Sequence, residues 1–392
     1  MAPPSPFVFE HAGTELRYGR GRVADLGPAL ADRGLGRALV VTGSNVGANP
    51  DVMGPIEAGL GDRLAGVFDG TTPAKRAGTV SDGIAAMRDA GADALVGVGG
   101  GSSLDIARQI SAFAGDDRSL ADLRAEFEAE GRIVPPDPDD PTPVAVVPTT
   151  FAGADVSGGG SIEVFPPESS PTGHPVRTGG AVDPFLAVHD PALFATTPRA
   201  PFAGSAMNGF NKGIETLYAR TATPITDATA GDGLSLLAAG LPSLGESEGL
   251  ERAVVGTVLV QFERRTSIIH AFGHGFARRY DLQQGVAHAV VTPAVLRHVF
   301  GAVDARRDRI ARALGVDADR PSDAVAGGIV EAVAGIRDAL DLPARLRALG
   351  AVERDHLPAI AEFVDDDIPE ARLPAGLDPT VEDLEGVLRA AW

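Results

Sequence analysis

The first half of the chain alternates short apolar runs with segments of helical period, and this alternation constrains the fold more than any other feature. The runs ALVVTG (38–43), LAGVFDG (64–70) and ADALVGVGG (92–100) end in Gly or Asp. Between them, DVMGPIEAGLG and GTVSDGIAAMRDAG carry apolar residues at helical spacing. VAVVPTT (144–150) supplies a further buried strand. The pattern predicts a Rossmann-like parallel sheet with helices on both faces.

A different pattern follows this half. The segment PPDPDDPTP (135–143) predicts a solvated loop, and SGGGSIEVFPP with the stretch to about residue 180 predicts a hairpin or a lid. From about residue 198 the segments are long and helical in period, including LERAVVGTVLVQFERRTSIIHAFGHGFARRY. Because 392 residues exceed the size of one hydrophobic core, we predict an α/β domain over 1–195 and an all-α domain over 196–392.

The composition excludes several classes of protein. The chain has no cysteine, which excludes disulfides, zinc-thiolate sites, iron–sulfur clusters and cysteine nucleophiles. A net charge of −19 argues against nucleic acid and anionic membranes as partners. No apolar run approaches the length that spans a bilayer, and the first residues lack the pattern of a signal peptide. We therefore expect a cytoplasmic protein whose partner is a small molecule.

Lysine is nearly absent from the chain. Lys75 and Lys212 are the only lysines, whereas arginine is common. An acidic, lysine-poor surface fits a halophile, because high salt screens the repulsion between like charges. High genomic GC content also depletes lysine, so both explanations stay open. In either case, a chain that otherwise avoids lysine keeps one at position 212.

A glycine-rich turn indicates a site for a nucleotide. GVGGGSSLDIARQI (97–110) joins a buried strand to a helix through three glycines and two serines. The glycines allow a close approach of the backbone, and Ser102 or Ser103 can cap the helix, whose free amides then suit a pyrophosphate. The candidate cofactor-binding residues here are Gly99, Gly100, Gly101, Ser102, Ser103 and Asp105. A tight turn without a ligand is the alternative.

A second candidate element is PTTFAGADVS (148–157), which places a Thr pair at the end of a strand. Ligands of open α/β sheets bind at the carboxyl ends of strands, so Thr149, Thr150 and Phe151 are further candidates for cofactor contact. The alternative is a plain polar loop.

Together with HDPAL, SAMNGFNKGIETLYAR and HAFGHGFARRYDLQQGVAHAV, these motifs resemble the iron-containing alcohol dehydrogenase superfamily over almost the whole chain. The resemblance implies the iron-type alcohol dehydrogenase architecture, shared distantly with dehydroquinate synthase, with NAD or NADP and the substrate in a cleft between the domains. It also implies a homodimer. PTTFAGADVS, SAMN and ETLYAR are more similar to the maleylacetate reductases, which work without a metal and carry Asn where the iron enzymes have a ligand Asp.

Five residues of the helical half are candidates for the catalytic site. Asn208 and Lys212, like His270 and His274, are four residues apart and so share one face of a helix. Of the family's four metal positions, which fall here on Asn208, Lys212, His270 and Gln284, only His270 keeps a usual ligand. Because an ammonium has three donors and no acceptor, Lys212 cannot ligate a cation while charged. We therefore expect no metal.

Carbonyl reduction needs positive charge or a proton donor at the developing alkoxide, which a metal ordinarily supplies. Lys212 can replace that metal as the electrophile; a carboxylate anchor or a structural lysine are the alternatives. His270 and His274 are candidates for proton transfer, or else core histidines. Asn208 and Gln284 can hold the substrate oxygen or orient Lys212, or they are ordinary helix amides. His288 is a weaker candidate on the next helix.

The leading hypothesis is a metal-independent NAD(P)-dependent oxidoreductase that acts on a small carbonyl or alcohol, such as the carboxylated maleylacetate. An acidic residue at position 43 would repel a 2′-phosphate, and Gly43 with Ser44 and Asn45 removes that block, so NADP is favoured no less than NAD. The alternatives are a nucleotide-binding pseudoenzyme and a metal-dependent alcohol dehydrogenase with an atypical site. A sugar-phosphate cyclase would need more metal ligands than the chain offers.

Overall fold

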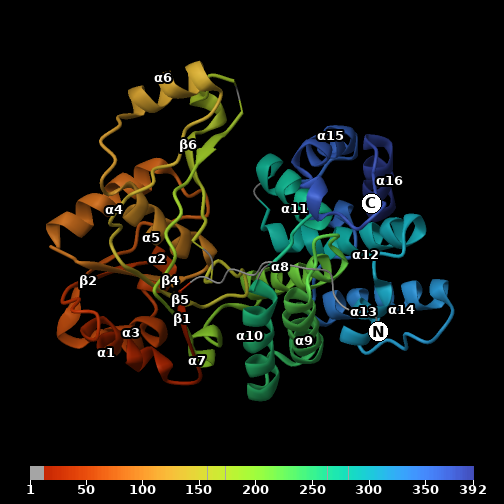
Figure 1. Cartoon of the computed structure of the whole chain (residues 1–392), viewed down its shortest axis with the longest axis horizontal. Coiled ribbons are helices and arrows are strands. Elements are labelled where there is room, and N and C mark those ends of the chain that lie inside the picture. The colour runs from red at the N-terminus through yellow and green to blue at the C-terminus, as the bar shows by residue number, and fades with distance from the viewer. Residues whose placement is uncertain (1–12, 157, 173, 263, 281) are drawn as a thin grey trace. The chain divides into compact units, whose positions relative to one another are not determined.

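The structure is a computed structural model that describes residues 13–392, except residues 157, 173, 263 and 281 (Figure 1). Its first half is an α/β fold and its second half is all helical, which confirms the predicted fold class.

Six parallel strands form the sheet of the first half, in the order β1-β8-β5-β4-β2-β3. Each apolar run that the sequence singled out is one of these strands. Their bounds are β1 (Glu15–Tyr18), β2 (Ala38–Val41), β3 (Leu64–Phe68), β4 (Ala94–Gly99), β5 (Val144–Pro148) and β8 (Leu186–His189). No apolar run in the sequence predicted β1 or β8.

Side chains of the central strands alternate between two hydrophobic cores. Leu39 and Leu95 pack with the helices α4 (Ala77–Asp89) and α5 (Gly101–Phe113). Val40 and Val96 pack instead with α1 (Leu26–Ala31) and α3 (Pro50–Leu60). Figure 1 shows these two pairs of helices on opposite sides of the strands. Burial on both faces explains why the strands read as continuous apolar runs.

An excursion leaves the sheet between β5 and β8. It contains the antiparallel pair β6 (Ile162–Phe165) and β7 (Val176–Thr178), as the predicted hairpin requires. The helix α6 (Leu120–Glu130) lies beside this pair (Figure 1), where Arg124 stacks on Phe165 and donates to the carbonyl oxygen of Ser169. The two remaining helices of this half are short, α2 (Ser44–Gly47) and α7 (Pro191–Phe194).

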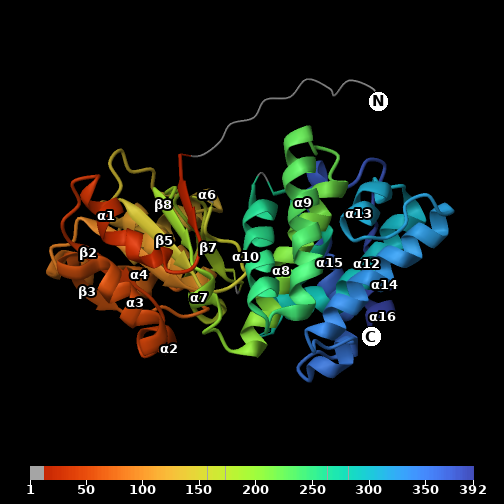
Figure 2. The ribbon, with the colours of Figure 1, turned by 90° about the horizontal axis from the view of Figure 1, so that it is seen from below.

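The second half is a set of helices around α8 (Arg199–Tyr218), which packs against α9, α10, α11 and α12. Figure 2 shows α8, α9 and α10 side by side. The bounds of the other helices are α9 (Pro224–Gly240), α10 (Ser247–Gln261), α11 (Ile268–Arg279), α12 (Gln284–Ala302), α13 (Arg307–Ala313), α14 (Ser322–Ala339), α15 (Leu357–Asp367) and α16 (Val381–Ala391). Among the described residues, none of the helices is long and apolar enough to cross a membrane.

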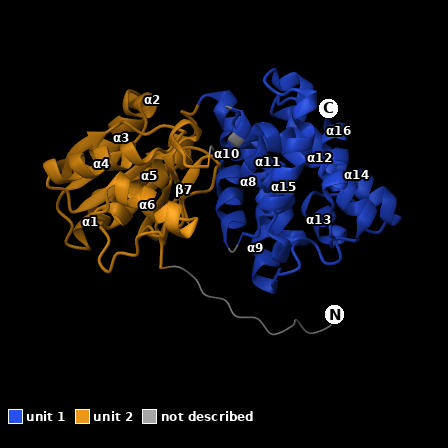
Figure 3. Cartoon of the chain, turned by 90° about the horizontal axis from the view of Figure 1, so that it is seen from above, with its two compact units in different colours: residues 1–9, 198–392 blue, residues 10–197 orange. Residues whose placement is uncertain are grey.

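The chain divides into two compact units (Figure 3), and the division falls between Thr197 and Pro198. This point lies two residues beyond the boundary that the change of pattern suggested. One feature of the helical unit differs from the expectation. The run from Leu250 to Tyr280 is periodic throughout, yet the structure breaks it after Gln261 and starts α11 only at Ile268.

Candidate active site

The strand order of the α/β unit reverses its direction between β2 and β4. The chain passes from β2 to β3 on one side, whereas β4 continues to β5 on the other. Such a reversal of strand order is where open α/β sheets bind nucleotides. The two loops at this point are those that carry Gly43 to Asn45 and Gly99 to Gly101, so the fold brings together two of the predicted cofactor segments. The side chains of Ser44 and Asn45 are exposed.

The turn between β4 and α5 leaves the first amides of the helix without a side-chain cap. Gly99 has a φ of +124°, which favours glycine, and a side chain at Gly100 would meet Thr150. The helix begins at Gly101, and its N-cap Gly100 provides no side-chain bond. The prediction that Ser102 or Ser103 caps this helix is therefore wrong. Both serines lie inside the first turn, where Ser103 Oγ hydrogen bonds with Thr71 Oγ1 at 2.7 Å instead.

The loop after β5 lies against this turn and is held from two sides. The amide of Thr149 donates to the carbonyl oxygen of Gly99 over 2.9 Å, and Thr197 Oγ1 donates to the carbonyl oxygen of Thr149 over 2.7 Å. Further along, the buried His189 and Asp155 hydrogen bond through Nε2 and Oδ2. These contacts place Thr149 and Thr150 beside the glycine turn, and their part in cofactor binding stays a prediction.

Two other predicted cofactor residues lie in the interior. The ring of Phe151 is fully buried and packs 5.4 Å from the ring of Phe194. Asp105 Oδ2 accepts from Lys75 Nζ at 2.8 Å, and Oδ1 pairs with the fully buried Arg108. Both side chains are thus occupied by internal contacts, and their part in cofactor binding stays a prediction.

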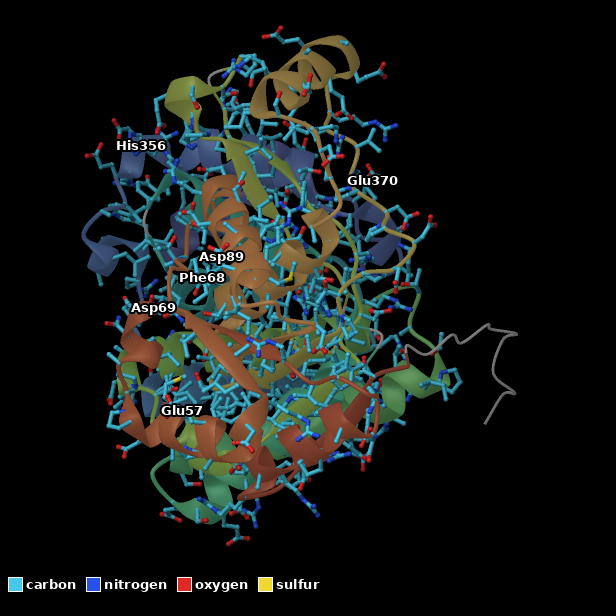
Figure 4. All side chains as sticks on the ribbon, turned by 90° about the vertical axis from the view of Figure 1, so that its left-hand side faces the viewer. Glu57, Phe68, Asp69, Asp89, His356 and Glu370 are labelled. Atoms are coloured by element: carbon cyan, nitrogen blue, oxygen red, sulfur yellow. The ribbon has the colours of Figure 1, made fainter. Side chains whose placement is uncertain are left out.

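Asp69 is an acidic residue at this edge that the sequence analysis missed. It follows Phe68, the last residue of β3 (Figure 4). A Cβ built on Gly47 of α2 would lie 3.0 Å from the Cβ of Asp69. Because Asp69 sits on the neighbouring strand and not at position 43, only the strand order could have revealed it.

In the helical unit, one face of α8 carries the polar side chains of the candidate site. Asn208, Lys212 and Glu215 follow one another at helical spacing and reach three different helices. Asn208 Nδ2 donates to Gln284 Oε1 of α12 at 3.1 Å. Lys212 Nζ donates to Gln261 Oε1 of α10, also at 3.1 Å. The predicted Asn208, Lys212 and Gln284 are thus fixed in place by hydrogen bonds.

Glu215 binds the third helix, α11, and explains why α11 starts where it does. Its Oε1 accepts from the amides of Ile269 at 2.7 Å and His270 at 3.2 Å, and its Oε2 pairs with His270 Nδ1. A carboxylate at a helix N-terminus satisfies amides that the helix itself leaves open. The break before α11 therefore serves to seat the fully buried Glu215.

The Glu215–His270 pair is poised near neutral pH. Burial raises the pKa of Glu215 to about 7, although its bonds to the backbone amides oppose the rise. Burial, followed by the charge of Lys212, holds the pKa of His270 well below its usual range. Above pH about 7 the pair is a carboxylate and a neutral imidazole whose Nδ1–H donates to it. His270 Nε2 is then an open proton acceptor.

Below that pH the pair takes up one proton. Whether this proton resides on Oε2 or on Nδ1, the imidazole must carry hydrogen on Nε2, because Nδ1 is engaged with Glu215. His270 Nε2 has no hydrogen-bond partner among the described residues. Glu215 thus makes His270 Nε2 a proton donor below neutrality and an acceptor above it, which is the requirement for an acid–base catalyst.

Two more histidines border this pair. The fully buried His288 lies with its ring centre 4.5 Å from that of His270, and burial likewise depresses its pKa. A Cβ on Gly273 would come within 2.0 Å of His288 Nε2, so a glycine is needed there. The predicted His274 is more exposed than His270 and His288, since 44% of its side chain is accessible. Its Nδ1 hydrogen bonds with Asp367 Oδ2 at 2.6 Å.

Comparisons with known proteins agree with this geometry. Residues 13–166 match the iron-containing alcohol dehydrogenase family, and residues 202–392 match the C-terminal domain of the Fe-containing alcohol dehydrogenase family. The chain belongs to the iron-containing alcohol dehydrogenase family. It is therefore an oxidoreductase. Motifs and fold together confirm the resemblance found in the sequence.

Individual relatives have about a quarter of their aligned residues identical to those of this family member. It is 26% identical to the NAD-dependent methanol dehydrogenase of Bacillus methanolicus over 95% of this chain and 97% of that protein. It is 28% identical to the maleylacetate reductase of a Rhizobium species, over 91% of each chain. A crystal structure of 1,3-propanediol oxidoreductase superposes with a TM-score of 0.84 at 22% identity, covering 96% of this chain and 97% of that one.

The family's metal does not fit the donors of this member. Asn208 Oδ1 and His270 Nε2 are buried without a hydrogen-bond partner among the described residues, and only the second is a usual ligand of iron or zinc. Gln284 Oε1 already accepts from Asn208, Lys212 brings a cation, and Glu215 is used by α11. Iron and zinc sites need several imidazoles or carboxylates with open lone pairs. Within the described part of the chain, the one cluster of three such groups is Glu353, Asp355 and His356, and the first two are exposed. The candidate site thus disagrees with a resident divalent ion.

Proposed function

We propose that the chain is a metal-independent NAD(P)-dependent oxidoreductase that reduces a small carbonyl compound, such as maleylacetate or another carboxylated substrate. The observation that carries the proposal is Lys212, a buried ammonium that Gln261 holds beside the amides and imidazoles where the family places its metal. A fixed cation in a poorly hydrated site stabilises a developing alkoxide as a metal would.

The residues divide the work of the reaction. A nicotinamide supplies the hydride when it is bound. Lys212 donates a hydrogen bond to the substrate oxygen as negative charge develops there, and His270 Nε2–H provides the proton that converts the alkoxide to the alcohol. The Glu215–His270 pair is then left as a carboxylate and a neutral imidazole, and a proton from solvent restores Nε2–H. Asn208 and Gln284 hold the substrate oxygen or orient Lys212.

For the cofactor, we propose that the glycine turn at Gly99 to Gly101 takes the pyrophosphate. Its first-turn amides carry no side-chain cap, as an anion site requires. One relative is named as NAD-dependent, while Gly43 brings no acidic side chain that would repel a 2′-phosphate and Asp69 adds a negative charge nearby. Oxidation of NADH and of NADPH by the same preparation, with one carbonyl substrate, measures the preference. The variant Asp69→Asn should improve use of NADPH relative to NADH.

The test of the main proposal combines metal analysis with variants of Lys212. We expect less than stoichiometric iron and zinc in active protein. Lys212→Ala should lower kcat by about two orders of magnitude or more, the usual cost of a lost electrostatic group. Lys212→Arg, which keeps the charge, serves as the control and should retain more activity than Lys212→Ala. Stoichiometric metal in active protein, or a fully active Lys212→Ala, would refute the proposal.

A nucleotide-binding pseudoenzyme is the second candidate, because it would also keep the glycine turn while the metal ligands are lost. It would bind NADH or NADPH but oxidise neither with any carbonyl substrate. The pairing of Glu215 with His270, whose buried Nε2 has no partner among the described residues, favours the enzyme, because such strongly shifted titratable groups cluster at functional sites.

A further inference from the structure

Gln261 is the last residue of α10, and neither the sequence motifs nor the family's metal positions include it. Its side chain is buried, with 2% of the residue exposed. Its Oε1 accepts the hydrogen bond from Lys212 Nζ, and its Nε2 has no hydrogen-bond partner among the described residues. A buried amide nitrogen without a partner costs free energy, so this group calls for an explanation.

The hydrogen bond from Lys212 fixes which way the amide of Gln261 points. Because a lysine ammonium only donates, it must face the oxygen of Gln261 and not the nitrogen. The two N–H donors of Gln261 therefore lie on the side of the amide away from that bond, one carbon atom from the oxygen that holds Lys212. The Lys212 ammonium and the two unpaired N–H groups of Gln261 therefore form one group of hydrogen-bond donors, in which the ammonium carries a positive charge.

We infer that Gln261 is a further residue of the active site, which positions Lys212 through Oε1 and binds a carboxylate group of the substrate through Nε2. This inference rests on the proposed function and names its substrate class. A carboxylate accepts hydrogen bonds only, so it satisfies the unpaired N–H donors, and Lys212 offsets its charge. A neutral aldehyde or alcohol without a second acceptor leaves the amide of Gln261 unpaired.

The first experiment measures binding without turnover. Succinate, a dicarboxylate probe, is titrated calorimetrically into the full-length protein at constant ionic strength. Gln261→Glu keeps an oxygen for Lys212 but replaces the N–H donors with a negative charge, and should weaken the Kd for succinate at least tenfold. Gln261→Met removes the donors without adding charge and should weaken it at least threefold. Gln283→Glu, at an exposed position, makes the same change of charge and should leave the Kd unaltered.

The second experiment compares 4-oxobutanoate with its methyl ester as substrates. Gln261→Glu should raise KM for 4-oxobutanoate at least tenfold more than it raises KM for the methyl ester, because only the acid carries a negative charge that the new carboxylate repels. Gln261→Met, which no longer holds Lys212, should lower kcat for both substrates. Recovery of kcat with Gln261→Glu separates positioning of Lys212 from a merely structural role.

Three results would overturn the inference: wild-type protein that does not bind succinate, equal Kd values for wild type and Gln261→Glu, or equal losses for acid and ester in Gln261→Glu. If succinate binding depends on Gln261 but no carbonyl compound is reduced, the carboxylate site stands and the proposed reaction fails.

Discussion

Glu215 shows how a single residue couples local structure to chemistry. Its carboxylate closes the N-terminus of α11 and at the same time engages His270 Nδ1. The first role supports the second, because Oε1 is held by the amides of Ile269 and His270 while Oε2 is left to pair with Nδ1. His270 Nε2 is consequently the nitrogen of the pair that can exchange a proton with a substrate.

Glu215→Gln should separate these roles. The neutral amide oxygen can still accept from the backbone amides of α11, but it cannot share a proton with His270. In the wild type, burial raises the pKa of Glu215 to about 7, so carbonyl reduction should slow as pH rises through that value and the proton leaves His270 Nε2. The variant should lose this limb of the pH profile, and its kcat should fall about 100-fold or more.

Profiles of kcat from pH 5.5 to 9, measured with saturating substrate, check this expectation. Glu248→Gln removes a carboxylate from an exposed position on α10 and should behave as wild type. A Glu215→Gln enzyme with an unchanged pH profile would show that the pair does not supply the proton.

The sequence predicted some of these residues and missed others for a physical reason. The spacing of Asn208 and Lys212 is a property of one helix, so it could be read without knowing the neighbours. Gln284 was found through its motif. Gln261 has no distinctive spacing, and its role depends on which side of α10 packs against α8. That information is tertiary and appears only in the fold.

At the scale of elements, the packing of α8 against α12 positions two residues of the candidate site, Asn208 and Gln284. The two helices approach most closely at Gly204 and Gly285, where a Cβ on Gly285 would lie 1.7 Å from the carbonyl oxygen of Gly204. Real Cβ atoms never come so close to another atom, and a backbone carbonyl oxygen cannot move aside. One turn further along α8, Asn208 meets Gln284.

Gly285→Ala should therefore push α12 away from α8. We expect a loss of about 1–3 kcal/mol in the free energy of unfolding, typical of an overpacked core, and a lower kcat because Gln284 leaves Asn208. Gly301→Ala is the matched control on the same helix, since a Cβ at that position meets nothing within 4 Å. It should stabilise by about 0.5 kcal/mol through helix propensity. Urea denaturation of both variants measures the difference, and equal stability would show that the crossing tolerates a side chain.

The same scale shows where the sequence predicts elements well. The runs at β2, β3, β4 and β5 are apolar throughout because both faces of the sheet are covered. β1 (ELRY) has no such run, and its pairing with β8 joins residues about 170 positions apart in the chain. The sequence did not predict the break between α10 and α11 either, because the residues around it keep a helical period. The start of α11 depends on Glu215, which belongs to another helix.

For the whole molecule, the excess of acidic residues needs an explanation that codon usage cannot give. High GC content replaces lysine by arginine, and this exchange leaves the charge unchanged. It accounts for the two lysines but not for 53 acidic residues against 34 basic ones. Self-repulsion at a net charge of −19 destabilises the folded state at low salt and is screened within about 3 Å at 1 M salt.

We therefore predict that the protein is halophilic in its stability. Raising KCl from 0.1 to 2 M should increase Tm by about 5 °C or more, equivalent to a gain of about 4 kcal/mol for a chain of 392 residues. Asp139→Asn with Asp140→Asn removes two exposed charges from the loop 135–143 and should raise Tm at 0.1 M KCl but not at 2 M, because salt already screens those charges. A general effect of salt on water would act equally on wild type and variant. If Tm is flat or falls with KCl, the repulsion is too weak to matter, and the scarcity of lysine reflects codon usage alone.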